Sequence, residues 1–502
     1  MKQAFLVMLL AGGLVGSVQA GSKDPASFIP IVNYLVQDTS RWEIYQDNRG
    51  LFVRPLPGSQ PGAFWPKHTG RNYIFGAGLW VGALDTTDRD TVVAQGYDLL
   101  SGGSMFGPCL PNGDTTGAMT DSLARIYRSD IPRDTAQWSE RDSLGRAVYY
   151  SDQELWAIYS GLYDLRPGFP PVGVTCLRRS LAWHSPGPWG DITKMEFEVK
   201  NITGRWQGRP RTLRKMIVGF AVDADIGNES STNANDLCFV SPSGGSTYPN
   251  LAVQYQLAQE GGWGPPGPPY QVGLRFVEGP VNNTRDTIRV RSQPGIGYPQ
   301  YDHDILPGQP LGMTAFQIYS LAPPSTPGSS YLWLSGRYWQ TPQILNSYQK
   351  DIVGPADKRF IFACGPFDLP NDSVAKFVIH IIGASDSLDL IRKAELLGVE
   401  SPPGPVARSA SDVVLYPSIP NPARGSCLIR YALPEPFPVT LRVYDVSGRL
   451  VRELVRGERS AGSQSVSWDG RDVVGNLVAS GVYLYRLEVS DKSWVKKTVL
   501  LR

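Results

Sequence analysis

The sequence predicts an all-β protein: a large β-rich N-terminal region, built like a β-sandwich of one or more subdomains, followed by a C-terminal Ig-like β-sandwich. The 502 residues include 53 Gly and 42 Pro, which interrupt the chain too often for long helices. Apolar residues make up 41% of a chain that is longer than one core usually serves. Short segments that alternate between apolar and polar residues recur between turn signals, as β-strands do.

Residues 1–20 have the pattern of a secretory signal peptide. Lys2 precedes the apolar run 4–11, and the segment ends in Val18-Gln19-Ala20, so cleavage is predicted after Ala20. An uncleaved membrane anchor is the alternative, but the apolar run is short for a bilayer span. No later segment is apolar enough to span a membrane. The mature protein is therefore expected to be secreted or to lie on the outer cell surface.

Residues 21–400 are the predicted β-rich region. Residues 194–200 alternate between apolar and charged side chains, which predicts a half-buried strand, whereas residues 377–382 are mostly apolar and predict a strand buried on both faces. Only residues 387–397 have helical spacing. The predicted apolar stripe of this helix consists of Leu388, Ile391, Ala394, Glu395 and Leu397.

A linker is predicted over residues 401–411, which are rich in Pro and Ser and have no apolar periodicity. After it, residues 412–502 contain short alternating segments at the spacing of a β-sandwich. These segments are 427–433, 439–446, 450–455, 463–468, 482–489 and 494–501. The alternation places Cys427, Ile429, Tyr431 and Leu433 on one buried face, and Trp468 is predicted to lie in the same core.

Ordered motifs in residues 412–502 resemble the flagellar hook-capping (FlgD-type) Ig-like domain, a pattern that also closes many cargo proteins of the type IX secretion system. The motifs are Pro420-Asn421-Pro422, Val443-Tyr444-Asp445-Val446-Ser447-Gly448-Arg449, Trp468-Asp469-Gly470 and Ala479-Ser480-Gly481-Val482-Tyr483. The resemblance implies an Ig-like fold without catalytic residues, a sorting or anchoring role, and the export machinery as a partner. Four further segments are similar to segments of uncharacterised exported proteins that carry the same C-terminal domain: residues 72–83, 151–159, 218–227 and 364–369.

Composition excludes several classes of function. A formal net charge of +2 argues against a nucleic-acid binder, which needs a concentrated basic face. The chain has no Gly-x-Ser-x-Gly elbow, no His-Glu-x-x-His and no P-loop, and Gly76 and Gly78 are interpreted as permitting tight strand packing. The sequence thus favours a non-enzymatic protein without deciding the question. The cysteines are odd in number and widely spaced, unlike a disulfide framework or a zinc site: Cys109, Cys176, Cys238, Cys364 and Cys427.

One acidic segment has the character of a metal site. Asp223 and Asp225 follow a predicted strand, and the polar stretch after them runs on to Asp236. Alternate carboxylates together with amide oxygens suit Ca²⁺, which takes six to eight oxygen ligands. We therefore predict a Ca²⁺ site with Asp223, Asp225 and Asp236 as ligands. The alternative is a polar loop held by Asx-turns.

Two functions compete at this stage. The leading hypothesis is an exported surface or envelope protein whose middle region is structural, adhesive or ligand-binding, with envelope polysaccharide as a candidate partner. The alternative is a secreted polysaccharide-binding or glycoside-degrading protein, which needs two carboxylates that meet in space. Its first candidates are Asp152, Glu154, Asp223 and Asp225. A sugar-stacking platform would come from Trp65, Trp80, Trp156, Trp183 and Trp189, although large aromatic side chains mostly serve cores.

Overall fold

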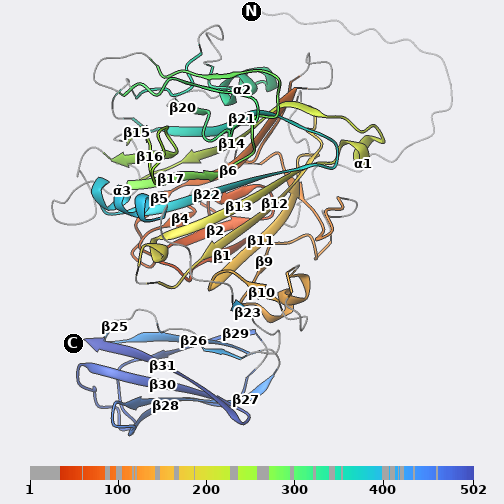
Figure 1. Ribbon diagram of the computed structural model, residues 1–502. Helices are drawn as coiled ribbons and strands as arrows, with labels where there is room; N and C mark the ends of the chain where they lie inside the picture. The colour runs from red at the N-terminus through yellow and green to blue at the C-terminus, as the bar shows by residue number, and fades with distance from the viewer. Residues whose placement is uncertain are drawn as a thin grey trace, which may run out of the picture.

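The computed structural model shows a large β-sandwich body and a smaller C-terminal β-sandwich below it (Figure 1). The predicted signal peptide over 1–20, and the predicted linker over 401–411 apart from residues 406–407, lie outside the described residues. The described residues are 34–58, 60–84, 91–97, 104–115, 118, 121–138, 140–141, 147–162, 169–185, 187–226, 236–256, 271–293, 299–319, 324–337, 345–351, 354, 356–397, 406–407, 413–415, 418, 423–433, 436–459 and 462–501.

One layer of the large body is an antiparallel sheet of nine strands. In spatial order these are β15 (Asp236–Ser241), β16 (Leu251–Gln256), β17 (Gln271–Glu278), β22 (Val374–Ala384), β13 (Ile192–Asn201), β12 (Val174–Ala182), β11 (Gln153–Ser160) and β8 (Gly107–Pro108), with β9 (Tyr127–Arg128) also paired to β11. The predicted strands over 194–200 and 377–382 are the neighbours β13 and β22. Strand β13 alternates between buried and half-buried residues, as predicted.

The second layer is an antiparallel sheet of six strands. In order they are β20 (Ala315–Tyr319), β21 (Arg359–Leu369), β14 (Leu213–Asp223), β6 (Gly76–Leu84) and β3 (Leu51–Val53). Strand β7 (Thr91–Gln95) also pairs with β6, at residues further along β6 than those that pair with β3. The long central strands β14 and β21 are almost fully buried, because the sheet packs on the nine-stranded layer on one side and on α2 (Pro327–Leu334) on the other.

Aromatic rings join the two layers. Phe220 of β14 lies 5.3 Å from Phe197 of β13 and 6.4 Å from Phe377 of β22, measured between ring centroids. Within its own sheet Phe220 stacks on Phe362 at 5.0 Å. Such ring pairs add about 0.5–1.5 kcal/mol each beyond the area they bury. The prediction of a β-sandwich for the large region is therefore confirmed.

Smaller elements cover the edges of the sandwich. They are a four-stranded sheet of β1 (Tyr34–Gln37), β2 (Glu43–Asp47), β4 (Ala63–Phe64) and β5 (Asn72–Ile74), the hairpin β18 (Ile288–Val290) and β19 (His303–Ile305), the 3₁₀ helices η2 (Pro132–Gln137) and η3 (Pro188–Asp191), and α1 (Thr203–Gln207).

The predicted helix over 387–397 is α3 (Ser387–Leu396), but the predicted stripe was partly wrong. Leu388 is 81% exposed and Ile391 is 48% exposed, whereas the buried face contains Leu390, Lys393 and Ala394. The buried Lys393 contacts Asp191 at 3.0 Å and donates to the carbonyl of Gly383 at 2.8 Å. Lys393 thus lies on the buried side of the helix beside Leu390 and Ala394, which a count of apolar residues could not show.

The C-terminal domain is a sandwich of a three-stranded and a five-stranded sheet. The first consists of β24 (Val414–Leu415), β26 (Cys427–Leu433) and β29 (Gly462–Trp468), and the second of β25 (Ala423–Arg424), β31 (Lys492–Leu501), β30 (Gly481–Val489), β27 (Phe437–Asp445) and β28 (Leu450–Arg459). All six predicted strands are confirmed. Cys427, Ile429, Tyr431 and Leu433 are buried on one face, and Trp468 is fully buried.

Contacts between the sandwiches include a strand pairing and an ion pair. Residues 406–407 form β23 (Val406–Ala407), which pairs antiparallel with β10 (Val148–Tyr149) of the large body. In addition, Arg430 of β26 lies 3.0 Å from Asp38. The predicted linker thus includes a short strand that is paired to the large body.

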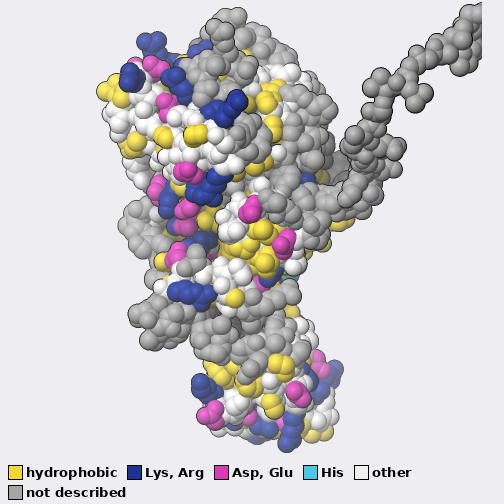
Figure 2. Space-filling view, turned by 90° about the vertical axis from the view of Figure 1, so that its right-hand side faces the viewer, with side chains coloured by type: hydrophobic (Ala, Val, Ile, Leu, Met, Phe, Trp, Pro, Cys, Tyr) yellow, Lys and Arg dark blue, Asp and Glu magenta, His cyan; other side chains and the backbone are white. Residues whose placement is uncertain are grey.

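Charges of both signs are mixed on the face of the molecule that Figure 2 shows. Figure 2 shows Lys and Arg interspersed with Asp and Glu on the face in view, and hydrophobic side chains gathered in the middle of the large body. Among the described residues, no helix has the length and apolar character needed to cross a membrane.

Candidate metal site

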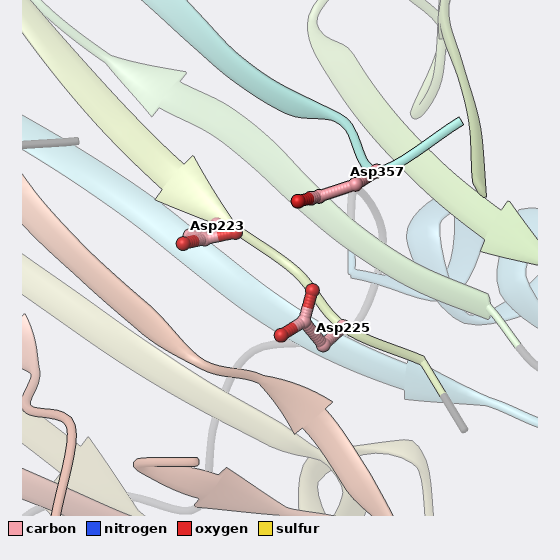
Figure 3. Close-up of side chains that lie close together, drawn as sticks. All are labelled: Asp223, Asp225 and Asp357. Atoms are coloured by element: carbon pink, nitrogen blue, oxygen red, sulfur yellow. The ribbon is translucent and has the colours of Figure 1, made fainter. Parts of the chain in front are cut away.

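The candidate site lies where two strands of the six-stranded sheet meet. Strand β14 ends at Asp223, and Asp225 follows two residues later, while Asp357 lies just before the start of β21. The strands are antiparallel, with Asp223 opposite Arg359, so the end of one lies beside the beginning of the other. One oxygen from each of Asp223, Asp225 and Asp357 lies within 4.8 Å of the others. Figure 3 shows their carboxylates around a common space.

The nine-stranded sheet contributes Asp236. Its backbone pairs with Ala356, with N···O distances of 3.2 Å and 3.3 Å, which places the first residue of β15 beside Asp357. From the neighbouring strand β16, the amide of Gln254 donates to the carbonyls of Ala224 and Lys358. The site therefore lies at a seam where both sheets of the sandwich are tied together.

Tyr97 and Arg359 hold Asp223 in place. The Tyr97 hydroxyl donates to Asp223 Oδ2 at 2.7 Å, and Arg359 Nε donates to the same oxygen at 2.8 Å. Tyr97 can approach because position 76 is Gly: a Cβ there would lie 2.4 Å from the tyrosine ring. A Cβ at Gly78 would meet the backbone of the segment 96–97 at 2.5 Å. The interpretation of both glycines as close-packing residues is confirmed.

Burial raises the pKa of three carboxyl groups at the site, those of Asp223, Asp225 and Asp236. Burial is the largest influence on Asp225, and the charges of Asp223 and Asp357 add to it, so its pKa rises to about 7. Burial also raises the pKa of Asp223, against the opposing effects of Arg359 and Tyr97. The pKa of Asp236 is raised well above its ordinary value by burial and by the neighbouring charges of Asp225 and Asp357. Each of these carboxyl groups therefore favours a bound proton or a cation nearby.

Several carboxylate oxygens of the cluster have no well-formed hydrogen bond from a described residue, although the Gln254 side chain opposes the rise in the pKa of Asp236. Among the described residues, Oδ1 of Asp223, Asp225 and Asp357 and both oxygens of Asp236 are buried without a hydrogen bond of ordinary geometry. Asp236 is fully buried, and the nearby Gln254 amide is already shared between two carbonyls. Unpaired buried acceptors of this kind are rare in folded proteins.

The charges of the cluster do not balance within the described part of the chain. Arg359 contacts Asp223 and also Asp357, whose oxygens lie 3.4 Å from its Nη1. The adjacent Lys358 contacts Asp351 and the Gly354 carbonyl instead. An all-oxygen, mainly anionic donor set suits a hard divalent cation. A buried group of three aspartates could thus hold a metal ion.

The structure brings together two of the three predicted ligands. Asp223 and Asp225 share one site, and Asp236 lies near them without belonging to the group of three oxygens within 4.8 Å. The polar stretch 227–235 lies outside the described residues. No pattern in the sequence indicates Asp357, Arg359 or Tyr97, which are far from Asp223 along the chain. Only the pairing of β14 with β21 and the approach of the segment after β7 reveal them.

The candidates for glycoside hydrolysis do not form one centre. Glu154 is buried and pairs with Arg179 at 2.8 Å, and Asp152 accepts from the backbone of His184 at 2.8 Å. Neither Asp152 nor Glu154 belongs to the carboxylate group of Asp223, Asp225 and Asp357. The tryptophan platform was wrong for the members that are at most 5% exposed: Trp65, Trp80, Trp183 and Trp189.

The five cysteines and the acidic segment 301–304 are structural. All five cysteines are free and buried. In the segment 301–304, Asp304 pairs with Arg291 at 2.6 Å, and Asp302 accepts from the backbone of Ser292 at 2.8 Å, so these groups hold the β18–β19 hairpin.

Comparisons with solved structures find only distant similarity. A polysaccharide lyase matches with 9% identity and a TM-score of 0.27, over 95% of this chain and 47% of the lyase. Dimeric latent PorU from Porphyromonas gingivalis matches with 13% identity and a TM-score of 0.16, over 69% of this chain and 31% of PorU. PorZ, a surface component of the type IX secretion system of the same organism, matches with 13% identity and a TM-score of 0.15, over 94% of this chain and 70% of PorZ.

Similarity at this level assigns neither an activity nor a partner. The chain also spans about half the length of the lyase and less than a third of PorU. A comparison with curated proteins finds no match. The family comparison is specific for one part of the chain and agrees with the strands and core described above: residues 423–493 are a FlgD Ig-like domain.

Proposed function

We propose that this protein is exported to the cell surface or the medium, that its FlgD Ig-like domain is the sorting signal, and that its large sandwich is stabilised by calcium. The match of residues 423–493 to the FlgD Ig-like family carries the proposal. This domain has a core of its own, separate from that of the large body. A domain with its own core can be recognised by an export machinery without unfolding what precedes it.

Deletion of residues 412–502 in the native bacterium tests the sorting role. The full-length protein is expected outside the outer membrane, whereas the truncated protein should accumulate in the periplasm. The double variant Lys496→Ala plus Lys497→Ala retains the domain and tests whether its basic end is part of the signal. Surface delivery of the truncated protein would contradict the proposal and leave the domain a structural module.

The carboxylate cluster supports the calcium part of the proposal. Asp223, Asp225 and Asp357 would be ligands, and Asp236 would join them from the other sheet. Calcium is favoured over zinc because every candidate ligand is an oxygen and none is a sulfur or an imidazole nitrogen. A cation bound at the seam would neutralise the negative charge that Arg359 balances only in part.

Calorimetric titration of the metal-free mature protein with Ca²⁺ tests this part directly. One site per chain is expected, and the double variant Asp225→Asn plus Asp357→Asn should abolish it. Mg²⁺ serves as the comparison, since it demands a tighter octahedral arrangement. Absence of heat at millimolar Ca²⁺ would refute the site while leaving the sorting role intact.

A further inference from the structure

A pocket of about 290 Å³ opens on the outer face of the nine-stranded sheet, remote from the carboxylate cluster in the sequence. Its floor is formed by side chains from three adjacent strands. Trp156 of β11 lies opposite Arg179 of β12, which lies opposite Glu196 of β13. Two residues along each strand, Ile158, Leu177 and Glu198 form a second row. Residues two apart on a strand share a face, so the rows form one surface.

Two tryptophans form an aromatic corner of this pocket. The ring of Trp156 stacks on Tyr127 with a centroid distance of 4.4 Å and an interplanar angle of 14°. Trp138, which follows η2, meets Trp156 edge to face at 6.3 Å and Tyr149 at 4.8 Å. Both tryptophans line the pocket. Of the five tryptophans considered for a stacking platform, Trp156 is the one that is not in the core.

A fixed guanidinium lies in the floor between the aromatic corner and the acidic groups. Arg179 contacts the buried Glu154 at 2.8 Å and Glu140 at 2.9 Å, and its guanidinium lies 4.9 Å from the centroid of the Tyr150 ring. Burial lowers the pKa of Arg179, but Glu154 and Glu140 outweigh it, so the pKa is raised and the group stays charged. Because these contacts fix the side chain before a ligand arrives, binding would cost little ordering entropy.

The polar groups of the pocket combine acceptors and donors. Glu140, Glu196 and Glu198 expose 40%, 32% and 39% of their side chains, so a ligand can reach their oxygens. Lys194 and Lys376 neutralise the last two at 2.6 Å and 2.9 Å. Within the described part of the chain, the indole N–H groups of Trp138 and Trp156 donate no hydrogen bond. Trp156 is partly exposed and can meet a ligand, whereas Trp138 is 4% exposed and forms the wall behind it.

We propose that this pocket binds one ring of a neutral saccharide. A sugar ring has a C–H face that packs on an aromatic surface and hydroxyl groups around its edge that both donate and accept hydrogen bonds. The pocket offers an indole corner, carboxylate acceptors, and indole, guanidinium and amide donors in a volume near the lower end of ligand sites. Its carboxylates disfavour an anionic sugar. A basic peptide is the less suitable occupant, since Arg179, Lys194 and Lys376 already pair with the acidic groups.

The test is calorimetric titration of the full-length mature protein with cellohexaose, maltohexaose and mannohexaose. Hexagalacturonate and hexalysine serve as the anionic and cationic comparisons. At least one neutral hexasaccharide should bind at millimolar concentration or below, and both charged probes should not. Trp156→Ala should weaken binding about tenfold or more, the effect of losing one aromatic contact.

Two further variants separate binding from folding. Glu198→Gln keeps the shape of a half-exposed side chain, so it should weaken sugar binding without lowering the melting temperature. Trp494→Ala removes a partly buried tryptophan of the C-terminal domain and should leave sugar binding unchanged. Failure of all three neutral probes, binding that survives both Trp156→Ala and Glu198→Gln, or binding of hexalysine alone would each overturn the proposal. The last result would assign the pocket to a basic peptide.

Discussion

Replacing Asp225 by Asn should stabilise the metal-free protein at pH 8, the reverse of the usual effect of removing a polar group from a site. Burial and the charges of Asp223 and Asp357 raise the pKa of Asp225 from 3.8 to about 7. A carboxyl group whose pKa is raised on folding contributes stability while it is protonated and loses that stability as the pH rises through the folded value. The metal-free wild type should therefore lose stability from about pH 4 to above pH 7.

The size of this effect follows from the same pKa. Each tenfold change in an equilibrium is worth about 1.4 kcal/mol, so ionising Asp225 in the metal-free fold costs at most roughly 4 kcal/mol. The Asn side chain avoids this cost. Calcium at about a hundred times its dissociation constant stabilises the wild type by about 2.7 kcal/mol. At about 2.1 cal/mol/K of unfolding entropy per residue, that gain raises the melting temperature of the large sandwich by about 3–4 °C.

The assay is thermal unfolding in chelator and in calcium, at pH 5 and pH 8, for the wild type and Asp225→Asn. In chelator at pH 8 the variant should melt above the wild type, and at pH 5 the difference should shrink. In calcium the wild type should gain more than the variant. Asp372→Asn is the matched control, because it changes an Asp that is 53% exposed and lies beyond the opposite end of β21 from Asp357.

Two results would refute this reasoning. A variant that melts below the wild type in chelator at pH 8 would show that the ionised Asp225 carboxylate does not destabilise the metal-free fold. Identical melting of the wild type in chelator and in millimolar calcium would show that the cluster binds no calcium.

Three further predictions concern the rest of the chain. Residues 412–502 should unfold cooperatively in urea as an isolated fragment, and Trp468→Ala should cost about 3–5 kcal/mol there because the ring is fully buried. Arg430→Ala should lower the melting temperature near pH 7, because it removes the partly buried ion pair of Arg430 with Asp38. Burial raises the pKa of Asp38, but Arg430 and other groups outweigh it and the pKa is lowered. Calorimetry should therefore find that the difference in melting temperature vanishes as the pH falls through that lowered pKa. N-terminal sequencing of the exported protein should begin at Gly21, and Met1 retained in the cytosol would contradict the signal peptide.

Much of the C-terminal domain could be predicted from the sequence, because its strands alternate with one face buried. Strand β26 places Cys427, Ile429 and Tyr431 inward, as its pattern indicates. The same rule worked for β13 in the large body. It worked less well for α3, where the buried face follows the ion pair of Lys393 with Asp191 rather than the apolar residues alone.

Only the part of the candidate site that is local in sequence, Asp223 and Asp225, could be predicted. Asp223 and Asp225 are two residues apart, so the end of one strand was enough to select them. Asp357 reaches them through the pairing of β14 with β21, and Tyr97 through the space left at Gly76. Neither the pairing of these strands nor the approach of Tyr97 can be predicted from the spacing of residues along one sequence. The pairing register of distant strands decides which charged side chains meet. Sequence periodicity predicts which face of a strand a residue lies on, but it does not predict which strand lies next to it.

The position of the cluster explains how such a costly group of charges can persist in this fold. Several buried carboxylates beside one arginine would destabilise an interior unless protons or a cation neutralise them. Protons can do so below the raised pKa values, but at neutral pH the pKa of about 7 for Asp225 leaves that group only partly protonated. Asp223 and Asp357 belong to one sheet and Asp236 to the other, joined by the pairing of Asp236 with Ala356. A cation here would therefore do more than cancel charge, because it would add a link between the two layers of the sandwich. It would lie beside the bridge of Asp236 with Ala356 and the hydrogen bond that the Cys238 backbone donates to Asp351.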